Sequence, residues 1–195
     1  RLDSLKNIVV SSQSVKLGAG VRQRDLEFHP QLASHLPLVK QGIQWVGHDQ
    51  TRNRGTVGGS LVHADPSAEL ALAAAVLEAE LTLTSTQYGP RKLKAIDFFL
   101  GPMFTAVGET EALTDIEWPV WTGPHVGACF EETAIRKGDF AMASAACQIQ
   151  TQADGTVSRI SFGLGGVDGT PLAFHELASQ ILGQKLSADT AKQVA

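Results

Sequence analysis

The sequence has few cysteines, no excess of basic residues and no long hydrophobic run. Two cysteines in 195 residues are too few for the disulfide framework of a small secreted domain. The formal net charge of −4 argues against nucleic acid as the main partner. The most apolar run, residues 70–77, is far shorter than the roughly 20 residues of a membrane-spanning helix. With no signal-like start either, these absences favour a cytoplasmic protein.

What remains is an ordinary globular composition, with 43% hydrophobic and 18% charged residues, enough to form a core. Residues 8–18 predict a strand or a strand pair, and the spacing of apolar residues over 21–46 predicts short helices broken by two prolines. Residues 52–60 read as a polar, glycine-rich loop. Asp65 and Pro66 then predict a helix start, with Asp65 as the N-cap and the helix running to about residue 79.

Two prolines and a glycine within residues 118–124 indicate a boundary, so we assign residues 1–122 and 123–195 to separate domains. The second is predicted as three antiparallel strands and then two helices: residues 128–135, 141–151, 157–164, 172–182 and 187–194. The fold class is therefore α+β (mixed α/β). Cys129 and Cys147 fall in the first two of these strands and are predicted to be buried structural thiols.

The segment with the clearest chemistry is Thr56-Val57-Gly58-Gly59-Ser60. Glycines without Cβ atoms allow backbone amides to approach a ligand closely, and the two hydroxyls add donors, so the segment suits a diphosphate. Asp65, just downstream, can accept hydrogen bonds from sugar hydroxyls. The same pattern also suits a tight turn followed by a simple helix cap, and local chemistry leaves both interpretations open.

These motifs together resemble a known family. Residues 52–60 and 63–70 resemble the second flavin-binding segment in the FAD-binding medium subunit of molybdenum hydroxylases, the family of carbon monoxide dehydrogenase and xanthine dehydrogenase. The resemblance continues in the family's order at residues 97–101, 111–119, 136–141 and 164–171. It implies the middle FAD-binding subdomain of a vanillyl-alcohol-oxidase-type fold, followed by a small domain with a three-stranded antiparallel sheet and helices.

The resemblance also implies roles for individual residues. Those implied to contact FAD are Thr56, Gly58, Gly59 and Ser60 at the diphosphate with Asn53 as a weaker candidate, Asp65 at sugar hydroxyls, Leu113 near the flavin, and Lys137 and Asp139 beside the isoalloxazine. The family carries a further glycine-rich flavin loop, of the type Ala-Gly-Gly-Thr, upstream of this subdomain. The sequence shows no such loop, and we expect it to belong to the natural protein.

The function implied is electron transfer rather than substrate chemistry within this chain. No catalytic or metal-ligating residue is predicted here. The resemblance implies a large molybdenum–pterin subunit, a small subunit with [2Fe-2S] clusters, a dimer of heterotrimers and an external electron acceptor. Two alternatives stay open: a self-contained FAD-dependent oxidoreductase of the same fold, and a flavin-free scaffolding relative.

Overall fold

The computed structural model describes residues 2–136 and 138–192 of the chain. After a short 3-10 helix (Asp3–Lys6), the first part is built on a five-stranded antiparallel sheet in the order β1-β2-β7-β3-β4. Its strands are β1 (Ile8–Val10), β2 (Ser14–Gly18), β3 (Glu80–Ser85), β4 (Gly89–Lys94) and β7 (Glu111–Pro119). A small hairpin of β5 (Phe99–Gly101) and β6 (Phe104–Thr105) lies beside it.

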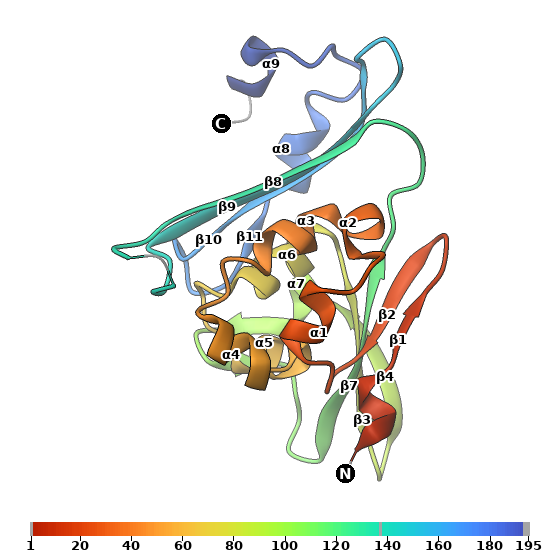
Figure 1. Ribbon diagram of the computed structural model, residues 1–195, viewed down its shortest axis with the longest axis vertical. Helices are drawn as coiled ribbons and strands as arrows, with labels where there is room; N and C mark the ends of the chain where they lie inside the picture. Colours follow the sequence, from red (N-terminus) through yellow and green to blue (C-terminus); the bar gives the residue numbers. More distant parts are fainter. Residues whose placement is uncertain (1, 137, 193–195) are drawn as a thin grey trace.

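The second sheet has four antiparallel strands in the order β11-β10-β9-β8. They are β8 (Val126–Thr133), β9 (Ala143–Thr151), β10 (Val157–Gly165) and the short β11 (Leu172–Ala173). The helices α8 (His175–Ser179) and α9 (Ala188–Lys192) lie on one side of this sheet, and the earlier helices lie on the other (Figure 1).

The remaining helices form a layer between the two sheets (Figure 1). They are α1 (Gln23–Glu27), α2 (Leu32–His35), α3 (Pro37–Gly42), α4 (Asp49–Arg54), α5 (Val57–His63), α6 (Glu69–Val76) and α7 (Ala95–Phe98). Helix α6 lies at the centre of this layer and contacts α3, α5 and α7 as well as strands β9, β10 and β11. The helical layer therefore joins the two sheets through one hydrophobic core.

Close packing of α6 on the second sheet depends on a glycine. An added Cβ on Gly163 would lie 2.1 Å from the Leu172 carbonyl oxygen and 2.7 Å from the Val76 Cγ2. A side chain at this position would force the backbone of β11 or helix α6 to move, and either movement would disturb the close packing of the core.

The structure confirms the mixed α/β class and much of the predicted element order. Residues 8–18 form a strand pair, the helices over 21–46 separate at the two prolines, and the three strands of the second part pair antiparallel. Because Leu172 and Ala173 add a fourth strand, the predicted helix from residue 172 begins only at His175. No helix among the described residues is long and apolar enough to cross a membrane.

Two predictions around the glycine-rich segment are wrong. Residues 52–60 are mostly helical, since α4 and α5 cover all but Gly55 and Thr56. Thr56 is the N-cap of α5, and its Oγ1 accepts a hydrogen bond from the Gly59 amide at 3.0 Å. Asp65 does not cap α6: its Oδ1 accepts from the Ser67 amide at 2.8 Å in a local turn, and the helix begins at Glu69.

The prediction for the two thiols is also wrong in part. Cys129 is exposed and Cys147 is half-buried. Their neighbours Phe130 and Ala146 point to the opposite face of the sheet and are buried in the core. Side chains alternate between the two faces of a strand. The thiols therefore lie on the outer face, which α8 and α9 cover incompletely.

We expect Gly163→Ala to lower the free energy of unfolding by about 1–3 kcal/mol, the usual cost of overpacking a core. Urea denaturation followed by circular dichroism measures it. Gly127→Ala in β8 is the matched control, because its added Cβ would come no closer than 3.8 Å to another atom. Equal denaturation midpoints for the two variants would contradict the packing argument.

Candidate functional site

A cavity of about 430 Å³ opens between α1, the α4–α5 region, the start of α6 and the turn that joins β8 to β9. Its volume falls in the range of about 300–1,000 Å³ that small-molecule sites usually have. Five residues singled out from the sequence line it: Thr56, Gly59, Ser60, Asp65 and Asp139. The fold thus brings residues from both predicted domains to one cavity.

Other residues singled out from the sequence lie elsewhere. Gly58 is buried and does not line the cavity, Asn53 is an exposed residue of α4, and Leu113 is part of the core on β7. Lys137 lies outside the described residues. Gly58 is needed for packing, because its added Cβ would lie 2.5 Å from the Ala19 Cβ.

The backbone amides at the start of α5 are already bonded within the chain. Val57 donates to the Val21 carbonyl at 2.9 Å, Gly58 to the Ala19 carbonyl at 3.0 Å, Gly59 to Thr56 Oγ1 at 3.0 Å and Ser60 to the Thr56 carbonyl at 3.1 Å. Because these amides are occupied, they do not form an anion site in this conformation. The hydroxyls of Thr56 and Ser60 remain as donors toward the cavity.

Two carboxylates stand together at the entry to α6. Asp65 uses Oδ1 in its turn, and among the described residues its Oδ2 has no hydrogen-bond donor. Burial, together with the nearby charges of Glu132 and Asp65, raises the pKa of Glu69 to about 7. Near neutral pH Glu69 is therefore present both as the acid and as the carboxylate, so it can donate or accept a hydrogen bond.

Gln23 adds an acceptor without a partner. The residue is 4% exposed, lines the cavity, and its Oε1 has no hydrogen-bond partner among the described residues. A buried polar atom left unpaired costs free energy, which a ligand donor would recover. A Cβ on Gly55 would lie 2.6 Å from this oxygen, so the glycine leaves the space that the amide group occupies.

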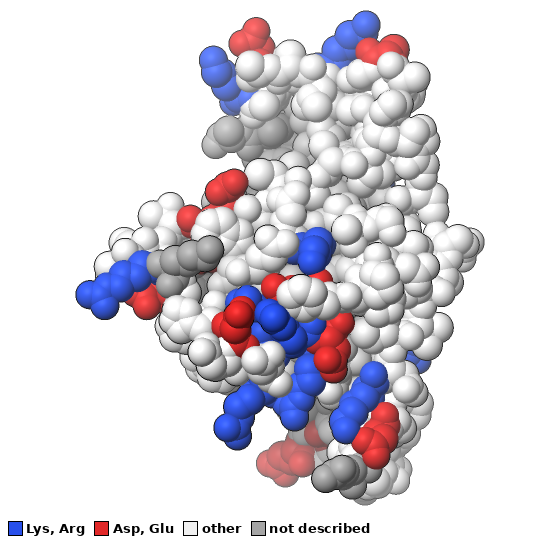
Figure 2. All heavy atoms as spheres, in the orientation of Figure 1, with Lys and Arg blue, Asp and Glu red and all other residues white. Residues whose placement is uncertain are grey.

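The wall beside α4 is held by a buried arginine. Arg52 Nε bonds Glu27 Oε2 at 2.9 Å, and its Nη1 donates to the carbonyls of Val46 at 2.9 Å and Gly47 at 3.1 Å. Figure 2 shows charged side chains of both signs gathered over this region of α1 and α4. Arg52 thus fixes the turn at Val46 and Gly47, which lines the cavity.

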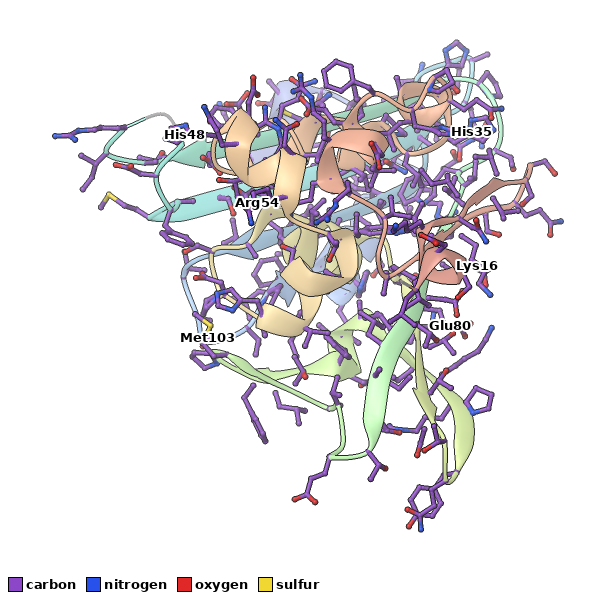
Figure 3. The ribbon with its side chains drawn as sticks, turned by 60° about the horizontal axis from the view of Figure 1, so that its bottom comes forward. Lys16, His35, His48, Arg54, Glu80 and Met103 are labelled. Carbon is purple, nitrogen blue, oxygen red and sulfur yellow. The ribbon has the colours of Figure 1, made fainter. Side chains whose placement is uncertain are left out.

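The turn between β8 and β9 rests against this wall. The ring of His48 fills the space that a Gly138 Cβ would need, with Cε1 at 2.3 Å from the Cβ position, and Gly138 has a φ of +90°. Figure 3 shows His48 beside this turn. From the turn just before α6, Ser67 Oγ donates to the Ala141 carbonyl at 2.8 Å. These contacts place Asp139 at the cavity.

Sequence reasoning missed Gln23 and Glu69 as functional residues. Glu69 left a usable signal, because it is the acidic first residue of an otherwise apolar helix. The sequence around Gln23 gives no such signal, since only the fold shows that its side chain is buried beside Gly55.

We expect Glu69→Gln to make unfolding less dependent on pH. Because the pKa of Glu69 is raised from 4.5 to about 7 by folding, the unfolded chain ionises first. Stability is therefore lost as pH rises from about 4.5 to 7. The free energy of unfolding of the variant should equal that of the parent at pH 4.5 and exceed it by up to about 3 kcal/mol at pH 8. Urea titrations at both pH values measure these free energies. The same difference between variant and parent at pH 4.5 and pH 8 would refute the prediction.

Comparison with known proteins assigns both parts of the chain. Residues 1–121 match the family described as the FAD binding domain in molybdopterin dehydrogenase, and residues 128–195 match the CO dehydrogenase flavoprotein C-terminal domain. Among curated relatives, the glyceraldehyde dehydrogenase medium chain of Sulfolobus acidocaldarius is 33% identical, with 100% of this chain and 68% of the relative aligned. The carbon monoxide dehydrogenase medium chain of Hydrogenophaga pseudoflava is 29% identical over 100% of this chain and 67% of its own length.

Solved structures agree. Carbon monoxide dehydrogenase from Hydrogenophaga pseudoflava superposes with a TM-score of 0.92 at 29% identity, covering 100% of this chain and 67% of that one. Quinoline 2-oxidoreductase from Pseudomonas putida superposes with a TM-score of 0.88 at 31% identity, covering 98% of this chain and 66% of that one. The chain thus spans about two thirds of the length of these relatives. It belongs to the family of FAD-binding medium subunits of molybdenum hydroxylases.

Proposed function

We propose that the cavity is this chain's share of an FAD site, in the medium subunit of a molybdenum-containing dehydrogenase or hydroxylase. The observation that carries the proposal is Gln23 Oε1, which has no hydrogen-bond partner among the described residues and lies in a cavity that hydroxyl and carboxyl groups also line. FAD offers hydroxyls along its ribityl and ribose units and an amino group on adenine. These donors match the acceptors that the cavity presents.

Each lining residue has a role in this proposal. The hydroxyls of Thr56 and Ser60 donate to diphosphate oxygens, and Gly59 allows the diphosphate to come close because it has no Cβ. Asp65 accepts from sugar hydroxyls through Oδ2, since its Oδ1 accepts from the Ser67 amide. Glu69 donates or accepts according to its protonation.

The other residues singled out from the sequence keep supporting roles. Gly58 acts indirectly, by letting α5 pack against Ala19. Leu113 supports the site from the core, and Asn53 is a peripheral contact. Lys137 and Asp139 are proposed to lie beside the isoalloxazine, with Asp139 held at the cavity wall.

At the level of the complex, FAD bound here would supply the redox chemistry that links iron–sulfur clusters of a small partner subunit to an external acceptor. Substrate oxidation is assigned to a molybdenum–pterin centre in a large partner subunit, in a dimer of heterotrimers located in the cytoplasm. The names of the relatives, which include several medium chains and subunits of dehydrogenases, support this assignment. We also propose a domain boundary between residues 122 and 123, in the link from β7 to β8.

We expect Gly59→Val to lower FAD affinity at least about tenfold, equivalent to about 1.4 kcal/mol. The added side chain enters the cavity, and its Cβ starts 2.7 Å from Thr56 Oγ1. Losing that helix cap costs about 1 kcal/mol, so the chain remains folded. The measurement is the FAD content of the purified full-length protein, followed by titration of the apoprotein with FAD.

Gly127→Val is the control, because it adds the same side chain to an exposed position of β8 away from the cavity. Full FAD occupancy in Gly59→Val would contradict the proposed site. Gly58→Val is unsuitable, since the clash with Ala19 would disturb folding. Purification of an active flavoprotein without iron–sulfur or molybdenum subunits would instead favour the self-contained oxidoreductase.

A further inference from the structure

The two cysteines of the sequence face each other across a pair of strands. Cys129 on β8 and Cys147 on β9 are direct partners in the antiparallel register. Directly opposed residues project from the same face of a sheet. Both thiols accordingly line a second, largely apolar cavity of about 350 Å³ on the face toward α8 and α9. Cys129 is exposed there and Cys147 is half-buried.

The hydrogen bonds of β8 identify the type of this pair. The Gln41 side chain donates to the Ala128 carbonyl at 2.7 Å and accepts from the Phe130 amide at 3.0 Å. Those backbone groups therefore point away from β9, and the backbone groups of Cys129 point toward it. The cysteines occupy a hydrogen-bonded position, where Cα atoms lie about 5.5 Å apart. That separation is within the range of about 4.4–6.8 Å for disulfides.

Closing the bond requires a small movement of one strand. Opposed Cβ atoms in a sheet lie about 4.5–5.5 Å apart, whereas a disulfide prefers about 3.5–4.5 Å. In the second sheet β8 lies at one edge, so it can approach β9 without displacing a further strand. A bond formed under this constraint is strained and correspondingly easy to reduce.

We propose that Cys129 and Cys147 form a reversible cross-strand disulfide, with hydrogen peroxide or another hydroperoxide as the oxidant. With hydrogen peroxide, the Cys129 thiolate attacks one oxygen, the O–O bond breaks, and a sulfenic acid forms while hydroxide takes up the thiol proton as water. The Cys147 sulfur then attacks the Cys129 sulfur and displaces hydroxide, which takes up the second thiol proton. Two thiols and one hydrogen peroxide thus give one disulfide and two waters.

The surroundings of the two thiols set their order of reaction. Burial, together with the neighbouring Cys129, raises the pKa of Cys147 to about 11. The thiolate is the reactive form, so the exposed Cys129 reacts first and Cys147 acts as the resolving thiol. The pair lies four residue pairs from the end of the β8–β9 hairpin, whose turn carries Asp139 of the first cavity.

The test uses the purified full-length protein, in its complex, after complete reduction and removal of the reductant. It is exposed to hydrogen peroxide, alkylated with iodoacetamide, digested with trypsin and analysed by mass spectrometry. Cleavage after Arg136 places the two cysteines in different peptides. We expect a cross-linked peptide pair with the mass of two hydrogens less than the sum of the free peptides, and its loss after dithiothreitol treatment.

The single variants separate the two steps. Cys147→Ala should leave a Cys129 sulfenic acid that dimedone traps, and Cys129→Ala should leave Cys147 reduced under the same peroxide exposure. Alkylation of both thiols after peroxide treatment would overturn the proposal. So would a bond that links heavy and light isotope-labelled copies, because it would be intermolecular. None of these outcomes depends on whether the first cavity binds FAD.

Discussion

Helix α6 carries seven consecutive apolar residues after Glu69, and all seven are buried. A helix without a polar face needs neighbours on every side, and here they come from both parts of the chain, through α3, α5 and α7 and through three strands of the second sheet. Gly163 allows the close approach on the sheet side. The two parts are therefore folded against each other around one helix.

The position of α6 also determines the candidate site. The chain enters the helix through Asp65 and Glu69, so both carboxyl groups stand at one end of it, where burial changes the protonation of the second. The same entry contacts the second part: Ser67 bonds the Ala141 carbonyl, and the Pro66 carbonyl accepts from the Gly166 amide at 2.8 Å. The packing that stabilises the core thus also forms the wall of the cavity.

The sequence predicted elements whose signals are local, and missed contacts that depend on the fold. The strand segments predicted within residues 8–18 and after residue 123 correspond to strands of the structure. The helical state of Gly58 and Gly59 was missed, because the Thr56 cap and the packing on Ala19 override the low helix propensity of glycine. The burial of Arg52 was not predicted, because its buried ion-pair partner Glu27 lies 25 residues away in the sequence.

The central claim is that FAD lies in the cavity beside α5 and α6. A crystal or cryo-electron-microscopy structure of the full-length protein loaded with FAD tests it most directly. We expect FAD oxygen atoms within hydrogen-bond distance of Thr56 or Ser60, an FAD hydroxyl that donates to Asp65, and an FAD donor that contacts Gln23 Oε1. Density for FAD that contacts none of these residues, in a protein with the same α5–α6 geometry, would contradict the account.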